Sequence, residues 1–299
     1  MAGHTFKTHA GYVAILGRPN VGKSTLLNKI LGKKISITAR KIQTTRHKIL
    51  GIKTIGNFQA VYVDTPGIHK KITSRLDHYM NRVASSVLND VDVIIFMVVG
   101  NLWRKEDEFI LQTILRTKCP VILGINKVDL ITQKNTLLGY IKRVSEKYQF
   151  TACVPLSAVR GVNLFALEEE IKKLLPPNHF FFPEEQITDR DKQFLASEII
   201  REKLTRFLGQ ELPYAVTVMV DRMGLRKGIM NIAATIYVER PGQKVIIIGK
   251  GGEVLKKIGM LARQNMESLF ACKVFLQLWV KVKAKWTHDE KLLRYLGYN

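Results

Sequence analysis

The sequence predicts an α/β domain with a mostly parallel sheet flanked by helices, followed by a smaller α+β domain. The chain has 299 residues, which fits two domains at roughly 100 to 200 residues each. Over residues 1–178, short apolar segments alternate with helical patterns, as in an α/β fold. The sequence Pro176-Pro177-Asn178 then breaks the helical pattern, and a different order of elements follows. We therefore expect one domain at 1–178, a linker at 179–190 and a second domain at 191–299.

The first domain is expected to have a buried sheet, because its strands are nearly continuous apolar runs. In such sheets, ligands bind beyond the carboxyl ends of the strands, so the loops that follow the strands are the places to search for a site. The expected strands are Tyr12–Leu16, Phe58–Val63, Val93–Val99, Val121–Asn126 and Cys153–Leu156.

The second domain has fewer elements and more alternation of apolar and polar residues. A helix, two β segments, a second helix, a strand and a terminal helix are expected in that order. Their ranges are Asp191–Leu208, Tyr214–Val220, Ile229–Glu239, Glu253–Phe270 and Lys273–Val282, with the terminal helix from about His288 to Leu296.

The composition is that of a globular protein with an anionic partner. Apolar residues make up 46% of the chain, and 47 basic against 25 acidic residues give a net charge of +22. This excess favours nucleic acid or an anionic membrane surface over a neutral substrate. The three cysteines are scattered without metal-ligand spacing, which fits a reducing cytoplasm. The longest apolar runs, such as Val91–Val99, are about half of the length that a membrane span needs.

A glycine-rich segment directly after the first strand predicts a P-loop. The segment fits the pattern GxxxxGK[ST] and precedes a helical pattern, so its backbone N–H groups and the helix N-terminus form an anion site. Lys23 is expected to reach the outer phosphates, and the Ser24 hydroxyl is expected to ligate Mg²⁺. The expected nucleotide-binding residues here are Gly17, Arg18, Pro19, Asn20, Val21, Gly22, Lys23, Ser24 and Thr25.

The sequence Asn126-Lys127-Val128-Asp129 selects the base. A carboxylate at Asp129 can accept hydrogen bonds from both N1–H and the 2-amino group of guanine, donors that adenine lacks. Asn126 is expected to brace the loops and Lys127 to lie over the purine ring. Ser157-Ala158 follows the last strand and is expected to direct a backbone N–H toward O6. The chemistry therefore predicts a GTP site.

Two further loops are expected to complete a nucleotide-dependent switch. Asp64-Thr65-Pro66-Gly67 ends a strand, where the carboxylate can hold Mg²⁺ and the Gly67 N–H can meet the γ-phosphate. The polar stretch Thr38–His47 contains two threonines that could complete the magnesium shell. We favour Thr45 over Thr44. The predicted metal ligands are thus Ser24, Thr45 and Asp64, and the predicted catalytic residues are Lys23, Asn20, Thr45 and Gly67.

The residue after Gly67 bears on the rate of hydrolysis. Ile68 stands where Ras-type enzymes place a glutamine that orients water, and an aliphatic side chain cannot hydrogen-bond water. Unaided hydrolysis is therefore expected to be slow. Asn20 could help to hold K⁺ near the phosphates, where the cation would act as an arginine finger does. Asn20 is equally compatible with a role as a turn former only.

In the second domain, Gly249-Lys250-Gly251-Gly252 opens a helix. This GxxG loop, with apolar residues on both sides, fits a groove for single-stranded nucleic acid, and the order of elements is that of a type II KH domain. The expected RNA-binding residues are Ile248, Gly249, Lys250, Gly251, Gly252, Lys256 and Lys257. The alternation Lys281, Lys283 and Lys285 is expected to place three cations on one strand face, either as a solvated edge or as a phosphate track.

Taken together, these motifs resemble the Era family of ribosome-assembly GTPases. The resemblance extends over nearly the whole chain, and the union of a G domain with a KH domain is more specific than any one motif. One departure from the general GTPase pattern is Val159, where an SAK loop has lysine. The segments that carry the resemblance are GRPNVGKSTLLNKILG, ISITARKIQTTRHKILGI, VYVDTPG, INKVD, LSA, ASEIIREKLTRFLGQELPY, IIIGKGG and LQLWVKVK.

The resemblance implies GTP binding and slow hydrolysis with Mg²⁺, binding of 16S rRNA near its 3′ end, and a role in maturation of the 30S subunit. It also implies a cytoplasmic protein with peripheral contact to the inner membrane. We expect a monomer, and we expect GTP to favour RNA capture and hydrolysis to favour release. An alternative is a membrane-associated cell-cycle signalling GTPase whose basic C-terminal region, with 11 basic and 4 acidic residues over 244–299, binds lipid or protein. A non-catalytic RNA-binding protein is disfavoured by the intact Lys23, Asp64 and Asp129.

Overall fold

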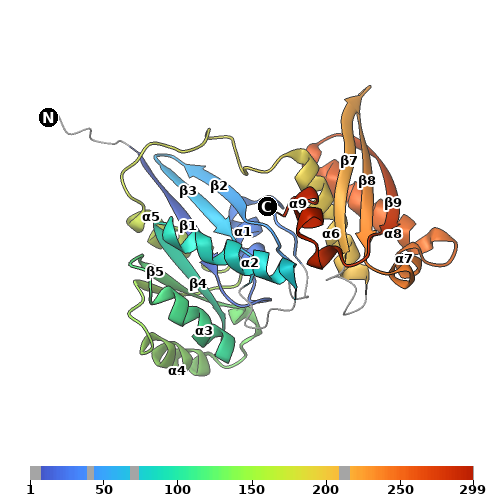
Figure 1. Cartoon of the computed structure of the whole chain (residues 1–299). Helices are drawn as coiled ribbons and strands as arrows, with labels where there is room; N and C mark the ends of the chain where they lie inside the picture. Colours follow the sequence, from blue (N-terminus) through green and yellow to red (C-terminus); the bar gives the residue numbers. More distant parts are fainter. Residues whose placement is uncertain (1–7, 39–43, 68–73, 209–215, 299) are drawn as a thin grey trace. The chain divides into compact units, whose positions relative to one another are not determined.

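The computed structural model of the chain describes residues 8–38, 44–67, 74–208 and 216–298. These residues form two compact units. The first unit comprises residues up to Ser36, Thr45–Lys71 and Met80–Asp189, and the second comprises Ile37–Thr44, Ile72–Tyr79 and Arg190–Asn299. Figure 1 labels most of the helices and strands of both units. The predicted domain division did not anticipate the grouping of two short N-terminal segments with the second unit.

The first unit is a six-stranded sheet with helices on both faces (Figure 1). The strand order is β2-β3-β1-β4-β5-β6, and all neighbours are parallel except β2 and β3, which are antiparallel. The strands are β1 (His9–Leu16), β2 (Ile49–Ile55), β3 (Phe58–Asp64), β4 (Val93–Val99), β5 (Val121–Asn126) and β6 (Ala152–Pro155). Strand β2 was not among the strands expected from the sequence.

Alternation along the strands assigns the helices to the two faces of this sheet. Leu50 and Ile52 join the core that lies under α3, α4 and the end of α2. The residue between them, Gly51, faces α1, and a β-carbon there would lie 2.5 Å from Leu27 of that helix. The helices are α1 (Lys23–Leu31), α2 (Arg75–Ser86), α3 (Lys105–Ile114), α4 (Lys134–Ser145) and α5 (Leu164–Leu174), with short 3₁₀ turns η1 (Val87–Asn89) and η2 (Val128–Leu130).

The segment expected to be a linker packs against the first unit. Phe181 stacks on Tyr12 with ring centroids 5.0 Å apart, and Ile52 donates its backbone N–H to Ile187 O at 2.9 Å. The boundary between the units falls after Asp189, at the C-terminal end of the expected linker. Ile187 and Thr188 therefore lie along the edge strand β2, which they contact by a hydrogen bond and an isolated bridge.

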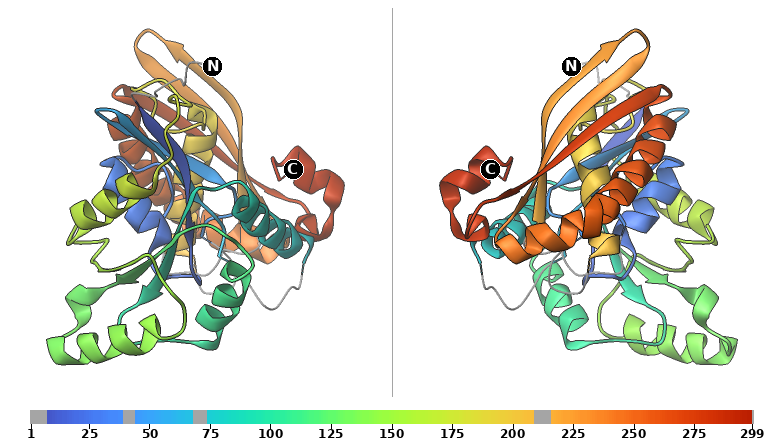
Figure 2. Two further views of the ribbon diagram at one scale, coloured as in Figure 1. Left: turned by 90° about the vertical axis from the view of Figure 1, so that its left-hand side faces the viewer. Right: turned by 90° about the vertical axis from the view of Figure 1, so that its right-hand side faces the viewer.

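The second unit is a three-stranded sheet with helices packed on one face. The order is β7-β8-β9, with β7 and β8 antiparallel and β8 and β9 parallel. Figure 2 shows the long β7–β8 hairpin in orange. The elements are α6 (Lys192–Phe207), β7 (Val216–Arg226), β8 (Ile229–Val238), α7 (Pro241–Ile248), η4 (Lys250–Gly252), α8 (Glu253–Phe270), β9 (Lys273–Val282), η5 (Trp286–His288) and α9 (Glu290–Tyr295).

Two features of this unit differ from the sequence-based expectation. The apolar run Val245–Ile248 belongs to a helix, which starts at Pro241 and is capped by Gln243, whose side chain accepts from the backbone N–H groups of residues 239 and 240. The lysine alternation is not realised as one strand face, because β9 ends at Val282 and Lys285 turns the chain with φ of 53°. Only Lys281 of the three lysines lies on the strand.

Candidate functional site

The loop after β1 has the backbone that its glycines permit. Gly17 has φ of 150° and Gly22 has φ of 109°. A β-carbon at Gly17 would lie 2.5 Å from Met97 O, and one at Gly22 would lie 2.3 Å from Asn126 Nδ2. Neither position tolerates a side chain without movement of its surroundings. The loop leads directly into α1, whose first residue is Lys23.

The Lys23 ammonium is buried in this loop. Its Nζ donates to Gly17 O at 2.8 Å and to Arg18 O at 3.2 Å, and the residue is 7% exposed. Burial lowers the pKa of Lys23 to about 8, against a smaller opposing effect of Asp64. A phosphate that enters the loop would give the ammonium an anionic partner in direct contact, where the described residues offer it two carbonyl oxygens.

A carboxylate and three hydroxyls meet at the carboxyl end of β3. Asp64 Oδ2 accepts from Ser24 Oγ at 2.7 Å, from Ser36 Oγ at 2.8 Å and from Thr45 Oγ1 at 3.5 Å. Ser24 Oγ and Thr45 Oγ1 are also 2.8 Å apart. The structure thus brings together the three residues predicted to ligate metal, and it adds Ser36, which the sequence analysis missed. Asn28 holds Ser36 in place, because its Oδ1 accepts the Ser36 N–H at 3.0 Å.

This cluster fits a magnesium ion. Asp64 is fully buried, and its second oxygen, Oδ1, has no hydrogen-bond partner among the described residues. Burial raises the pKa of Asp64, although Lys23 and the three hydroxyls act in the opposite direction. An unpaired buried carboxylate oxygen beside two hydroxyls is the hard oxygen set that Mg²⁺ prefers. Ser24, Thr45 and Asp64 are therefore suited to hold the ion directly or through water.

The turn after Asp64 is packed against the P-loop. Thr65 is buried, and its hydroxyl donates to Ile15 O at 3.4 Å. A β-carbon at Gly67 would lie 2.9 Å from the Pro19 ring, so this position requires glycine for close approach. Pro66 lies between them in the same buried turn. The position of Ile68 lies outside the described residues, as do the other residues of 68–73.

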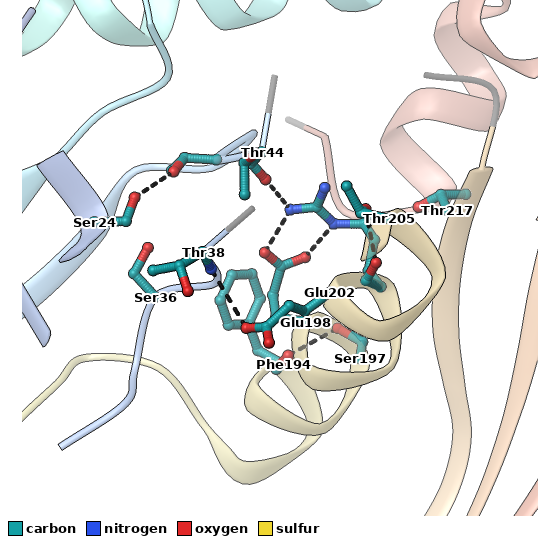
Figure 3. Close-up of polar contacts among 12 residues, drawn as sticks. Ser24, Ser36, Thr38, Thr44, Phe194, Ser197, Glu198, Glu202, Thr205 and Thr217 are labelled. Carbon is teal, nitrogen blue, oxygen red and sulfur yellow. Dashed lines mark hydrogen bonds and ion pairs between the residues drawn. The ribbon is translucent and has the colours of Figure 1, made fainter. Parts of the chain in front are cut away.

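The residues on the N-terminal side of Thr45 are bonded within the second unit. Arg201 on α6 donates from Nη2 to Thr44 O at 2.5 Å and to Glu198 Oε2 at 2.7 Å. Thr38 N–H lies 3.3 Å from Glu202 Oε2 (Figure 3). Thr44 and Thr45 thus differ in surroundings: the carbonyl of the first contacts α6, and the hydroxyl of the second contacts Ser24. Residues 39–43 of the predicted switch stretch lie outside the described residues.

The base-recognition loops are joined through Asn126. Its Nδ2 donates to Val21 O at 2.7 Å, and its Oδ1 accepts the N–H groups of Lys127 at 2.7 Å and Ala158 at 2.9 Å. The predicted bracing role of Asn126 matches this geometry. The Ala158 N–H, which was predicted to point toward O6 of guanine, donates to Asn126 Oδ1 in this structure. Ser157, just before it, is fully buried.

Lys127 and Asp129 occupy the start of the η2 turn. Lys127 has φ of 65°, and its Nζ donates to Asn20 O at 2.9 Å, which links the base loop to the P-loop. The Asp129 side chain is 14% exposed, and Arg160 Nε lies 4.0 Å from its Oδ2. Arg160 was not predicted to lie near Asp129, because only the neighbouring Val159 was compared with the lysine of an SAK loop. Val159 itself is 71% exposed.

The Arg18 side chain is bonded to α3. Its Nε bonds both oxygens of Asp107, at 3.1 and 3.0 Å, and the pair is buried. The side chain therefore links the P-loop to the start of α3. A phosphate in the loop would be bound by the backbone of Arg18 and not by its side chain. No motif pointed to Asp107, because the contact spans 89 positions in the sequence.

The GxxG loop of the second unit is open to solvent. Gly251 has φ of 59° and Gly252 has φ of 82°, and a β-carbon at either position would meet no atom within 4 Å. Gly249 is different, because a β-carbon there would lie 2.5 Å from Val254 Cγ2. Lys250 is exposed at the tip, and Ile248 is half-buried at the entrance. The loop can thus approach a polyanionic backbone closely.

Further cations and apolar groups border this loop. Lys256 and Lys257 are exposed on the first turn of α8, and Lys257 Nζ also lies 5.4 Å from the centre of the Phe207 ring. Val245 and Ile246 on α7 are 69% and 52% exposed, and the sequence analysis did not select them. Their exposure follows from the helical conformation, which no apolar run of this length reveals by itself.

Comparisons with known proteins agree with a nucleotide site in the first unit and a GxxG loop in the second. Residues 12–127 match the family model described as "50S ribosome-binding GTPase", and residues 211–287 match the "KH domain" model. The chain is 55% identical to GTPase Era of Histophilus somni (strain 129Pt) over 98% of both chains. It is 54% identical to GTPase Era of Haemophilus influenzae (strain KW20/Rd), over 98% of this chain and 97% of that one.

The chain belongs to the Era family of GTPases.

Solved structures of the Era family support the same assignment. A variant of Aquifex aeolicus Era bound to GDP·AlF₄⁻ matches with a TM-score of 0.94 and 41% identity, over 97% of this chain and 99% of that one. Era in complex with MgGDPNP and nucleotides 1506–1542 of 16S ribosomal RNA matches with a TM-score of 0.93 and 41% identity, at the same coverage. The predicted fold, a P-loop G domain followed by a type II KH domain, is confirmed.

Membership of the Era family also confirms the predicted activity, because this chain is a GTPase that uses a guanine nucleotide with Mg²⁺. The unpaired Asp64 Oδ1 and the buried Lys23 Nζ are the features of this chain that such a nucleotide would satisfy. None of the helices in the described part of the chain combines the length and apolarity that a bilayer span requires.

Proposed function

We propose that this Era-family GTPase binds single-stranded 16S rRNA through its KH loop and acts in assembly of the 30S ribosomal subunit. The observation that carries the proposal is the open Gly251-Gly252 turn with exposed Lys250, Lys256 and Lys257 around it. The related Era complex with nucleotides 1506–1542 of 16S ribosomal RNA supports this RNA as the partner.

The small subunit is favoured over the large one. The description "50S ribosome-binding GTPase" belongs to a family model that matches residues 12–127 alone, which exclude the KH domain. The Era complex with 16S RNA covers 97% of this chain, including the KH domain. Co-sedimentation of the protein with purified 30S and 50S subunits would distinguish the two, and preferential binding to 50S subunits would contradict the proposal.

In the first unit, we assign roles from the contacts above. Water attacks the γ-phosphorus of GTP, the bond to the β–γ bridging oxygen breaks, and GDP and phosphate leave. Lys23 would exchange its two carbonyl partners for phosphate oxygens and oppose the charge that develops there. Asp129 would accept the two guanine N–H donors. The Gly67 N–H would meet the γ-phosphate.

Asn20 is proposed to support a K⁺ ion near the β- and γ-phosphates. The residue is exposed in the P-loop with φ of 64°, and Lys127 holds its carbonyl in place. Replacement of K⁺ by Na⁺ at constant ionic strength should then lower the turnover number several-fold. Equal turnover in the two salts would leave Asn20 as a turn former.

Nucleotide state is proposed to govern RNA affinity through the segment at 37–44. Thr44 directly precedes Thr45, and its carbonyl accepts from Arg201 of α6. Thr38 is bonded to Arg206 and Glu202 of the same helix. When Mg²⁺ and the γ-phosphate fix the position of Thr45, the neighbouring Thr44 is constrained as well, and Thr44 is bonded to α6. Equal RNA affinities with GDP and with a non-hydrolysable GTP analogue, at matched salt, would contradict this coupling.

We also propose a cytoplasmic location with peripheral contact to the inner membrane. The support is the net charge of +22, which favours anionic surfaces. Flotation with vesicles of anionic lipid tests the membrane contact, and absence of binding to them at physiological salt would contradict it.

The RNA assignment is tested with Gly251→Asp and Gly252→Asp. An added carboxylate at the open turn should repel the phosphate backbone and abolish 16S rRNA binding, while basal GTP hydrolysis in the other unit is retained. The matched control is Gly242→Asp, because Gly242 also lies in open space but precedes the loop on α7. Unchanged RNA binding by both loop variants would refute the proposal.

A further inference from the structure

The sheet of the KH unit has one face that the helices do not cover. Side chains of α6, α7 and α8 pack on the face that carries Ile232, Ala234 and Ile236 of β8. The opposite face carries the alternate residues of the three strands. We call it the open sheet face, and define it by Arg222 and Arg226 of β7, Ile229, Asn231, Ala233 and Thr235 of β8, and Lys273, Phe275, Gln277, Trp279 and Lys281 of β9.

The C-terminal segment covers one end of this side of the sheet. Thr217 at the start of β7 is 3% exposed, and its hydroxyl lies 3.1 Å from the Tyr298 hydroxyl. Trp286 is fully buried and stacks with Tyr298, with ring centroids 6.0 Å apart. The other end of the sheet, toward the tip of the β7–β8 hairpin in Figure 2, has no such cover among the described residues.

Two aromatic rings stand on the uncovered part. Phe275 and Trp279 are 52% and 46% exposed. Their register partners on β8 are Asn231 and Thr235, and Asn231 is in turn paired with Gly224 of β7. Met219 of β7 pairs with Thr235, and beside these neighbours Phe275 and Trp279 still keep about half of their surface exposed. Because β9 is also an edge strand, exposed aromatic residues on it would favour aggregation unless a partner uses them.

Cations surround the two rings. Lys273 and Lys281 lie at either end of the ring row on β9, and Arg222 and Arg226 lie across the face on β7. None of these four forms an ion pair with a residue in the described part of the chain. The nearby carboxylate, Asp221, accepts the hydroxyl of the neighbouring threonine on β8 at 2.7 Å. The face therefore has a net positive charge that no ion pair among the described residues neutralises.

We propose that the open sheet face is a second surface for single-stranded RNA, distinct from the GxxG loop. Bases would stack on Phe275 and Trp279, and Lys273 and Lys281 would contact the phosphates. The two rings are four residues apart on a strand, or about 13 Å, so each can take a separate base. A flat sheet that presents aromatic rings among cations has the chemistry by which bases are held without a deep groove.

This inference rests on the proposed function, because it extends the RNA contact of the KH unit. A protein partner is disfavoured by the unpaired cations at both ends of the ring row, since a protein surface would have to bring carboxylates to each of them. A phosphate backbone supplies regularly spaced negative charge.

The test uses the full chain and a set of RNAs. The longest RNA carries 16S nucleotides 1506–1542, and the others are shortened from either end until binding is lost. Affinities are measured at one salt concentration for the wild type, Phe275→Ala/Trp279→Ala and Gly251→Asp. Phe165→Ala is the matched control, because Phe165 is 74% exposed on α5 of the other unit.

The double variant should lose about tenfold or more in affinity per ring for the long RNA, and should bind the shortest RNA that the wild type still binds with the affinity of the wild type. Trp279→Phe should retain affinity, because a ring remains to stack. Lys273→Gln/Lys281→Gln should lower the slope of log affinity against log salt by about two. Unaltered basal GTP turnover and thermal unfolding show that each variant is folded.

Wild-type affinity of the double variant for every RNA would overturn the inference, and so would loss of a protein partner with RNA binding unchanged. The proposed function fails separately, if Gly251→Asp binds all the RNAs normally. Should the double alanine variant be unstable, Trp279→Ala alone and the lysine pair decide the question, because their side chains are exposed and independent of the core.

Discussion

The hydroxyl of Ser24 donates a 2.7 Å hydrogen bond to Oδ2 of Asp64, whereas Oδ1 of the same buried carboxylate has no partner among the described residues. This pair joins the start of α1 to the end of β3. A buried carboxylate oxygen that lacks a hydrogen bond destabilises the fold, even though the other oxygen accepts three. The arrangement is explained if the carboxylate is kept for a cation.

We predict that Asp64→Asn removes most of the activity without unfolding the protein. An amide is nearly the same size and accepts the same three hydroxyls, but it lacks the charge that Mg²⁺ requires. Turnover of GTP should fall by at least about 100-fold, or about 2.7 kcal/mol in the barrier. The melting temperature of the nucleotide-free protein should stay equal or rise, because burial already raises the pKa of Asp64. Wild-type turnover would contradict the metal assignment.

Nucleotide binding should take up a proton at alkaline pH. Burial lowers the pKa of Lys23 to about 8, so at pH 8.5 the free protein holds this amine largely neutral. Phosphate oxygens favour the ammonium and raise the pKa again. Calorimetry of GDP binding at pH 8.5 in two buffers of different ionisation enthalpy should show this uptake, and a smaller one at pH 7. No difference between the buffers would show that Lys23 stays protonated.

The same pKa shift predicts the pH dependence of stability. The folded pKa of about 8 lies below the ordinary value of 10.5, so between these values the unfolded chain binds the extra proton. The Lys23 contribution therefore makes the nucleotide-free protein more stable as pH rises through this window. Lys23→Met should remove that increase in urea unfolding experiments. An identical pH profile in the variant would contradict the assignment.

Asp129→Asn should change the base preference. The carboxylate is matched to two N–H donors of guanine, whereas an amide can donate to the 2-oxygen of xanthine. GTP affinity is expected to fall by about 100-fold and XTP affinity to rise. Arg160→Ala is the control, because that side chain is 71% exposed and 4.0 Å from Asp129, and its loss should change GTP affinity by less than about threefold. Unchanged preference for GTP would remove Asp129 from the base site.

Arg201→Met should destabilise the KH unit. Arg201 and Glu198 are 3% and 6% exposed at their side chains, so the variant removes the guanidinium that is paired with a buried carboxylate. The expected loss is about 3–5 kcal/mol in the free energy of unfolding, measured by urea denaturation of the full chain. Arg201→Met/Glu198→Met should recover part of it. An Arg206→Ala control should cost less than about 1 kcal/mol, since Arg206 is half-exposed. A loss no larger than the control's would show that the pair is not a stabilising element.

The sequence predicted those parts of the site that depend on local patterns. The P-loop, Asp64 and Asn126 follow buried strands, and parallel strands bring such loops to one edge of a sheet. What it missed depends on long-range packing. Strand β2 was missed because Gly51 and Lys53 interrupt its apolar pattern, and its glycine is needed for contact with α1. No local sequence pattern predicts the hydrogen bond from Ser36 to Asp64.

In the second unit, the missed features have the same origin. Helix α7 contains a run of four apolar residues that resembles a strand. Pro241 at the start of the helix and the capping side chain of Gln243 favour the helical conformation. The bonds from Arg201 and Arg206 to residues 38 and 44 span more than 150 positions, so no spacing rule reveals them. The exposure of Phe275 and Trp279 required knowledge of which sheet face the helices cover.

The most direct test compares two activities on one preparation of wild type and Gly251→Asp. Basal GTP turnover is measured without RNA, and affinity for 16S nucleotides 1506–1542 is measured at the same salt concentration. The account predicts equal turnover in both proteins and loss of RNA binding in the variant. Retained RNA binding, or turnover lost together with it, would contradict two separate ligand sites on this chain.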